Sequence, residues 1–266
     1  GPAWAAQAAP PLLYVSQPAA AAIAEGTPEV PGILDALRQG PARPDEWPRE
    51  LLLGKVSGTE LSRLDAGGMA ALLRDALAAS PAGVGVDELL PGDWTADAGL
   101  ALADALRMLG PEQASRVVLY VSPGLVSRIG TTDPSRPLAP DLAAAVQALR
   151  LAGAVVLEMY RGDGAPRTAA ENAAFPSRWL PRFPGADADR LRIMTGPAGG
   201  QGQQALWAQL RSTAAGRRML ANGPAAYGLR TRREGQDWAR AYADFQAEPD
   251  SPPAEGDAPV AALGSL

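Results

Sequence analysis

The 266-residue sequence contains no cysteine and no histidine. These absences exclude disulfides, thiol nucleophiles and imidazole bases, and with them serine–histidine triads and nearly all zinc and haem sites. Lys55 is the single lysine, so 23 of the 24 basic residues are arginine. Any catalysis must therefore use carboxylates, hydroxyls, Lys55 or arginine, and we expect no cofactor and no metal ion.

Long hydrophobic runs and an excess of positive charge are also missing. No run of about 18 apolar residues exists, so we expect no membrane-spanning segment. The 24 basic and 29 acidic residues give a formal net charge of −5, which leaves no basic surface for a phosphate backbone. We therefore expect no nucleic-acid partner. The sequence leaves the oligomeric state open.

The two ends of the chain differ in composition from its middle. Residues 1–11 begin with Gly1-Pro2, typical of a removed tag, and contain Ala3-Trp4-Ala5, the small-x-small form that signal peptidases read. We interpret this segment as a tag remnant and leader, and expect a secreted or periplasmic protein. Residues 248–266, rich in proline, acidic residues and alanine, predict a surface tail. Residues 12–247 are expected to form one domain.

Short apolar or β-branched runs recur along this domain at intervals of about one strand, one helix and two loops. The predicted strands span residues 12–16, 51–57, 83–89, 116–122, 154–160, 191–195 and 225–231. Helical patterns cover residues 31–39, 67–79, 95–109, 140–151, 168–180, 202–220 and 235–246. Seven consecutive strand–helix units with right-handed crossovers form either an open doubly wound sheet or a closed barrel.

We expect the closed form, an α/β fold of the (β/α)8 TIM-barrel type in which seven strands are clearly readable. An open nucleotide-binding sheet normally carries a glycine-rich turn after its first strand, whereas Ser16-Gln17-Pro18 stands here. A barrel of about 250 residues also has the typical size. Alternation predicts that a set of strand residues is buried against the helices: Val84, Val86, Val117, Leu119, Val121, Val155, Leu157, Leu191 and Ile193.

Polar side chains gather where these strands end. In such barrels the chemistry lies at the carboxyl ends of the strands. The residues that alternation turns away from the helices there are Tyr14, Lys55, Asp87, Tyr120, Glu158 and Arg230. A polar residue at a strand end can simply mark the beginning of solvent, but the convergence of the whole set favours a site. We expect Lys55, Asp87, Tyr120 and Glu158 to share one concave pocket.

Three further residues lie at these strand ends or in the loops that follow them. Trp94 follows the third predicted strand, where it can stack on a sugar ring or pack against a helix. Tyr160 and Arg161 close the fifth strand and open a polar loop. The candidate substrate-binding residues are therefore Tyr14, Lys55, Trp94, Tyr120, Tyr160, Arg161 and Arg230.

The regular alternation of predicted strands and helices is accompanied by two motifs at strand ends, Val86-Asp87-Glu88 and Leu157-Glu158-Met159-Tyr160. In these features the sequence resembles glycoside hydrolases of the (β/α)-barrel kind. The resemblance implies a carbohydrate substrate cleaved by two carboxyl groups, chemistry that needs neither histidine nor metal. The candidate catalytic residues are Glu88, Glu158 and Asp87, with Glu88 as the preferred acid and Asp87 as an ionised helper near Lys55. The chain departs from the family in lacking the double-aspartate–glutamate signature of chitinase-like barrels and an Asn-Glu pair at the fourth strand.

Two other functions remain open at this point. A non-catalytic polysaccharide-binding or scaffold barrel would use its carboxylates only to pair with Lys55 and arginines. A Schiff-base lyase would use Lys55 as the nucleophile, if desolvation lowered the pKa of its amine.

Overall fold

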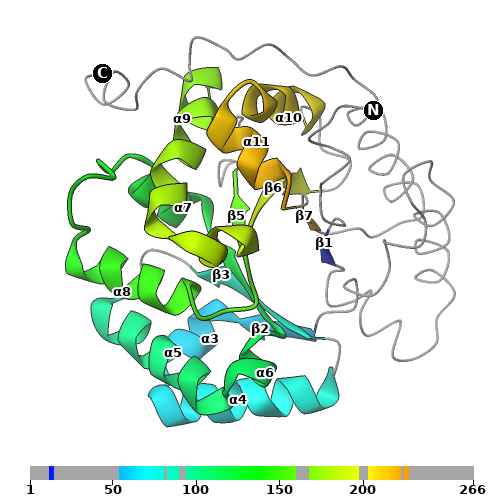
Figure 1. The fold of residues 1–266 in the computed structure, drawn as a ribbon. Coiled ribbons are helices and arrows are strands. Elements are labelled where there is room, and N and C mark those ends of the chain that lie inside the picture. The colour runs from blue at the N-terminus through cyan, green and yellow to red at the C-terminus, as the bar shows by residue number, and fades with distance from the viewer. Residues whose placement is uncertain are drawn as a thin grey trace, which may run out of the picture.

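The structure is a computed structural model that describes residues 12–14, 54–80, 83–89, 94–159, 168–197, 203–222 and 225–227. This part of the chain is an α/β fold built on a parallel sheet (Figure 1). Five strands have four or more residues: β2 (Gly54–Ser57), β3 (Val84–Leu89), β4 (Val117–Val121), β5 (Ala154–Glu158) and β6 (Leu191–Pro197). Two strands have three residues each, β1 (Leu12–Tyr14) and β7 (Ala225–Tyr227).

The strands are arranged in the order β1-β7-β6-β5-β4-β3-β2, and every neighbouring pair is parallel. Within the described residues β1 and β2 do not pair with each other, so they form the two edges of the sheet. The expected closed TIM-type barrel is therefore wrong. Closure requires backbone hydrogen bonds between the first and last strands together with a matched tilt and stagger, and the alternation within single strands carries no information on these.

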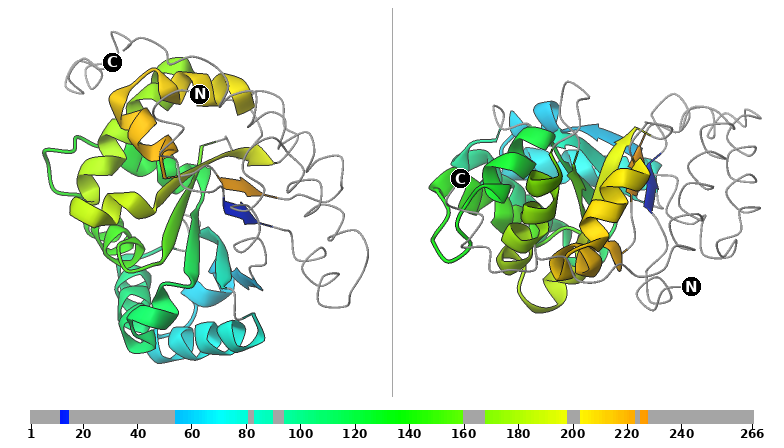
Figure 2. Two further views of the ribbon diagram at one scale, coloured as in Figure 1. Left: turned by 45° about the vertical axis from the view of Figure 1, so that its right-hand side comes forward. Right: turned by 90° about the horizontal axis from the view of Figure 1, so that it is seen from above.

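The helices lie in an arc along one side of the sheet (Figures 1 and 2). They are α3 (Gly58–Ser62), α4 (Ala66–Ala79), α5 (Ala96–Leu109), α6 (Pro111–Ala114), α7 (Pro123–Gly130), α8 (Pro140–Leu149), α9 (Ala169–Trp179), α10 (Gln203–Arg211) and α11 (Ala214–Leu220). Two 3-10 helices, η3 (Leu180–Arg182) and η4 (Gly185–Arg190), precede β6. Polar caps define several starts: Asp65 and Thr95 accept hydrogen bonds from backbone N–H groups three residues further on, at 2.7 and 3.1 Å.

The predicted helix over residues 202–220 is two helices, α10 and α11. Thr213 caps α11 by accepting a hydrogen bond from the Gly216 N–H at 3.0 Å. A Cβ atom at Gly216 would lie only 1.8 Å from the Leu210 carbonyl oxygen, so a glycine is needed where the two helices meet. The short helices α3, α6 and α7 are not predicted, because eight residues or fewer give too little periodic pattern.

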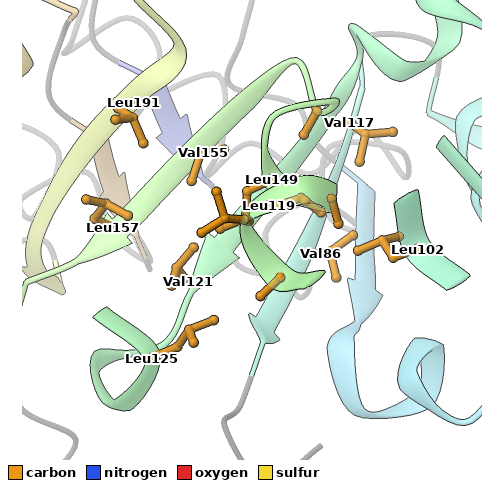
Figure 3. Close-up of a cluster of buried hydrophobic side chains, with 14 of the residues drawn as sticks. Val86, Leu102, Val117, Leu119, Val121, Leu125, Leu149, Val155, Leu157 and Leu191 are labelled. Atoms are coloured by element: carbon orange, nitrogen blue, oxygen red, sulfur yellow. The ribbon is translucent and has the colours of Figure 1, made fainter. Parts of the chain in front are cut away.

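The core lies between the sheet and the helices (Figure 3). The strand residues expected to be buried against the helices are all at most 1% exposed and belong to one hydrophobic cluster: Val84, Val86, Val117, Leu119, Val121, Val155, Leu157, Leu191 and Ile193. Helix residues such as Leu102, Leu125 and Leu149 complete this cluster. The predicted phase of these strands is confirmed. Among the helices of the described residues, none is long and apolar enough to cross a membrane.

Candidate functional site

The face of the sheet opposite the core carries the polar strand residues predicted from the sequence. Successive residues of a strand point to opposite faces, and the parallel register keeps Lys55, Asp87, Tyr120 and Glu158 in phase with one another and out of phase with the core residues. We call this surface, defined by those four residues, the polar face. Because all strands are parallel, Asp87, Tyr120 and Glu158 lie toward the carboxyl edge of the sheet. Lys55 stands level with Gly85 and Val118, nearer the amino ends, and reaches Asp87 through its long side chain.

Lys55 and Asp87 form an ion pair on the polar face. The Lys55 Nζ atom lies 3.1 Å from Asp87 Oδ2, and the two side chains are 31% and 15% exposed. The pair joins strands β2 and β3, which are neighbours in the sheet. The expected proximity of the two residues is confirmed. An amine held by a carboxylate at this distance is engaged in a structural contact, which does not favour a Schiff-base role for Lys55.

Tyr120 and Glu158 are both buried, at 1% and 2% exposure. Charged side chains are almost never fully buried unless they are held by partners or serve a function. Glu158 stands on β5 beside Met194 of β6, whereas Tyr120 stands on β4 beside Val156 of β5. Glu158 therefore belongs to the polar face and does not face the helix layer, as the expected site requires.

Two β-bulges disturb the carboxyl edge of the sheet. Val86 pairs with Leu119 and Leu89 pairs with Val121, so Asp87 and Glu88 together stand opposite one residue of β4. A second shift of the same kind occurs in β6, between Met194 and Pro197. Bulges re-aim side chains and are over-represented next to active sites. Strand β3 continues through Leu89, the last residue of the predicted strand 83–89, so Glu88 lies within the strand.

Trp94 packs in the hydrophobic core. Its side chain is 2% exposed and belongs to the cluster between sheet and helices. Its Nε1–H has no hydrogen-bond partner among the described residues. This position agrees with the helix-packing alternative for Trp94, since a ring that is almost fully covered offers little surface to a sugar.

Several candidate residues lie outside what the structure describes. Tyr14 and Glu88 belong to strands, but their side chains are not described. Tyr160, Arg161 and Arg230 lie wholly outside the described residues. Their assignments stay predictions.

Sequence reasoning missed one charged residue of the polar face, Arg192. It stands beside Val156 in the register between β5 and β6, out of phase with the core residues Leu191 and Ile193. The alternation of the predicted strand 191–195 contained this signal. Arg192 adds a positive charge two strands from Tyr120.

The chemistry available on the polar face is that of carboxyl groups, a phenol and basic side chains. Within the described ranges, no three acidic residues form a cluster that could hold a metal ion. A buried carboxyl on β5 and an ion-paired carboxylate on β3 occupy different surroundings, which suits proton transfer to and from a neutral polar substrate. Comparisons of the chain with protein families, with curated proteins and with solved structures found no match.

Proposed function

We propose that this chain hydrolyses glycosidic bonds on the polar face of its sheet. The observation that carries the proposal is the placement of two unlike carboxyl groups, buried Glu158 and ion-paired Asp87, on one face near the carboxyl edge. Glycosidic cleavage needs two carboxyl groups in different environments and neither histidine nor a metal ion. This chemistry is therefore available to a chain that contains no histidine and no cysteine.

The roles follow from the contacts of each group. Glu158 supplies one catalytic carboxyl, and the Asp87–Glu88 pair at the β3 bulge supplies the other. Lys55 holds Asp87 as its ionic partner, which suits Asp87 as an electrostatic helper and leaves Glu88 as the acid. Tyr120 stands on β4 between the two carboxyl-bearing strands and is buried, where its phenol can orient a carboxylate.

The strand spacing also predicts the stereochemistry. Strands β3 and β5 are separated by β4, so their backbones lie about 10 Å apart. Retaining glycosidases hold their carboxyls about 5–5.5 Å apart, whereas inverting enzymes leave about 6.5–9.5 Å for a water molecule. The wider arrangement is the one that two strands separated by a third produce most readily, so we expect inversion of the anomeric configuration.

The proposal is tested by incubating the full chain with polysaccharides and 4-nitrophenyl glycosides and measuring released reducing ends or nitrophenol. We expect hydrolysis of at least one substrate, with the product anomer inverted in ¹H NMR spectra. Glu158→Gln should lose about a hundred- to ten-thousandfold in rate while its circular dichroism stays unchanged. Glu112→Gln is the matched control, because Glu112 is 79% exposed and lies in α6, before β4. No hydrolysis by the wild type, or an active Glu158→Gln, would overturn the proposal.

A non-catalytic polysaccharide-binding role is the second candidate. The Lys55–Asp87 ion pair favours it, because a carboxylate used to tie two strands together has a structural role already. The same panel separates the two functions: retention of a polysaccharide on the protein without turnover, unaffected by Glu158→Gln, is the outcome that binding alone predicts.

A further inference from the structure

A groove lined by arginines lies at the amino ends of β4, β5 and β6, at the opposite end of the sheet from the polar-face site. It consists of two adjoining hollows of about 700 and 420 Å³, which share Arg107, Arg150 and Leu151. Arg182 and Asp187 line the larger hollow, and Arg190 lines the smaller one. We call the two hollows together the arginine groove.

The arginine groove concentrates positive charge on an acidic chain. Four arginines and one aspartate among the described lining residues give it a formal charge of +3, whereas the whole chain carries −5. A concave surface of one sign focuses the electrostatic field and raises the local concentration of the opposite charge. The groove is therefore suited to an anion.

Two of the four arginines are used within the fold. Arg190 donates to the backbone carbonyl of Ala152 at 2.7 Å and also binds the Asp187 carboxylate. Arg182 donates to the backbone carbonyls of Arg136 and Asp133, each at 2.8 Å. These contacts hold the 3-10 segments before β6 in place and leave the remaining two arginines as the candidate ligands.

Arg107 and Arg150 each use only one guanidinium nitrogen to bind a carboxylate. Arg107 donates through one Nη to Asp104 at 3.0 Å, and Arg150 donates through Nε to Asp187 at 2.8 Å. Their other guanidinium N–H groups have no hydrogen-bond partner in the part of the chain that the structure describes. The two side chains are 49% and 44% exposed, and both line both hollows, so their unused donors are available to a ligand.

The walls on either side of these arginines are apolar. The larger hollow is lined by Leu138, Ala143 and Val146, and the smaller one by Leu106, Pro111 and Ala114. The volumes fall in the range of about 300–1,000 Å³ that small-molecule sites occupy. Guanidinium groups between apolar walls fit a ligand in which an anionic group is attached to an apolar body.

We propose that the arginine groove binds an organic anion, with Arg107 and Arg150 holding its acidic group and the apolar walls holding its body. A guanidinium binds carboxylate, sulfonate or phosphate oxygens through paired N–H donors, which gives both affinity and orientation. The proposal is independent of the glycosidase activity, because none of the groove residues belongs to the polar face.

The test is a fluorescence titration of the full chain with 8-anilinonaphthalene-1-sulfonate, a sulfonate on an aromatic body. N-phenyl-1-naphthylamine, which has a similar body and no charge, is the matched neutral probe. We expect saturable binding of the sulfonate that weakens with salt and falls about tenfold in Arg107→Gln, with little change for the neutral probe. Arg74→Gln should bind as the wild type does, because Arg74 is exposed on α4 and lines neither hollow.

Arg107→Gln is expected to fold, since the one ion pair that Arg107 forms with the described residues is with Asp104 on the same helix, and circular dichroism checks this. Unchanged sulfonate affinity in Arg107→Gln would overturn the proposal. So would an equal loss for the neutral probe, which would assign the binding to apolar contact alone, or an absence of saturable binding in the wild type.

Discussion

At the scale of single residues, Asp187 shows how charge is arranged in the described part of the chain. Burial raises the pKa of Asp187, but the hydrogen bond from Arg150 and the charges of Arg190 and Arg150 outweigh this effect, so the pKa lies below its ordinary value of 3.8. The side chain is 25% exposed. Its ion pair with Arg150 joins the end of α8 to η4, and its second ion pair, with Arg190, lies within η4.

The lowered pKa of Asp187 predicts the direction in which the stability of the fold changes with pH. A carboxyl whose folded-state pKa is depressed stabilises the fold above its unfolded-state pKa, and this contribution is lost as the pH falls through the folded-state value. Asp187→Asn should therefore lower the free energy of unfolding by about 1–2 kcal/mol at pH 7, and the deficit should narrow near pH 3. Urea unfolding at the two pH values measures both.

Asp104→Asn is the control for this prediction. Asp104 is 60% exposed and pairs with Arg107 three residues along the same helix, a contact worth about 0.5 kcal/mol or less. A deficit for Asp187→Asn that is the same at pH 7 and pH 3 would contradict the electrostatic account.

The candidate site could be predicted in part at this scale. Alternation placed Lys55 near Asp87, and the structure shows the ion pair. The same alternation set Glu158 on the face away from the helices. It could not decide whether Trp94 stacks on a ligand or packs in the core, because a tryptophan after a strand satisfies both patterns equally well.

At the scale of secondary-structure elements, the helices α5 and α8 pack in very close contact. A Cβ atom at Gly99 of α5 would lie 2.7 Å from the carbonyl carbon of Ala144 in α8 and 2.8 Å from its Cβ. Such a distance is too short for any side chain, and the obstructing atoms belong mainly to the backbone. The approach of the two helices therefore depends on the missing side chain.

Gly99→Ala should push α5 and α8 apart and lower the free energy of unfolding by about 1–3 kcal/mol. Gly67→Ala makes a matched comparison, because a Cβ there meets only Asp65 Oδ1, at 3.7 Å. With no clash, the better helix propensity of alanine should leave stability unchanged or raise it by about 0.5 kcal/mol. Denaturant midpoints of the two variants that shift together in the same direction would show that the packing argument is wrong.

The elements themselves follow from the sequence to different degrees. All seven predicted strands are present, since each is a short apolar run bounded by turn residues. Helices α4, α5, α8 and α9 agree with their predicted ranges to within two residues at either end. The division of residues 203–220 at Thr213 was missed, because it depends on a contact between Gly216 and the Leu210 carbonyl that no periodic pattern reports.

At the scale of the whole molecule, the sheet separates two environments. One face is covered by helices and forms the core (Figures 1 and 3). The other, the polar face, carries Lys55, Asp87, Tyr120 and Glu158. The parallel arrangement places the candidate site toward the carboxyl ends of the strands and the arginine groove at their amino ends.

The error in the predicted fold also belongs to this scale. Strand–helix alternation predicts parallel neighbours in sequential order, and β2 to β7 follow that order. Whether a sheet closes depends on its curvature and on the pairing of β1 with β2, which in the chain are separated by residues 15–53. A local sequence pattern predicts neither the curvature of the sheet nor the pairing of β1 with β2.

A crystal structure of Glu158→Gln soaked with a saccharide that the wild type hydrolyses would show directly where the substrate binds. We expect the sugar on the polar face, at the carboxyl ends of β3, β4 and β5, with the scissile bond between residue 158 and the Asp87–Glu88 pair. A sugar bound in the arginine groove or on the helix side, with the polar face empty, would contradict this expectation.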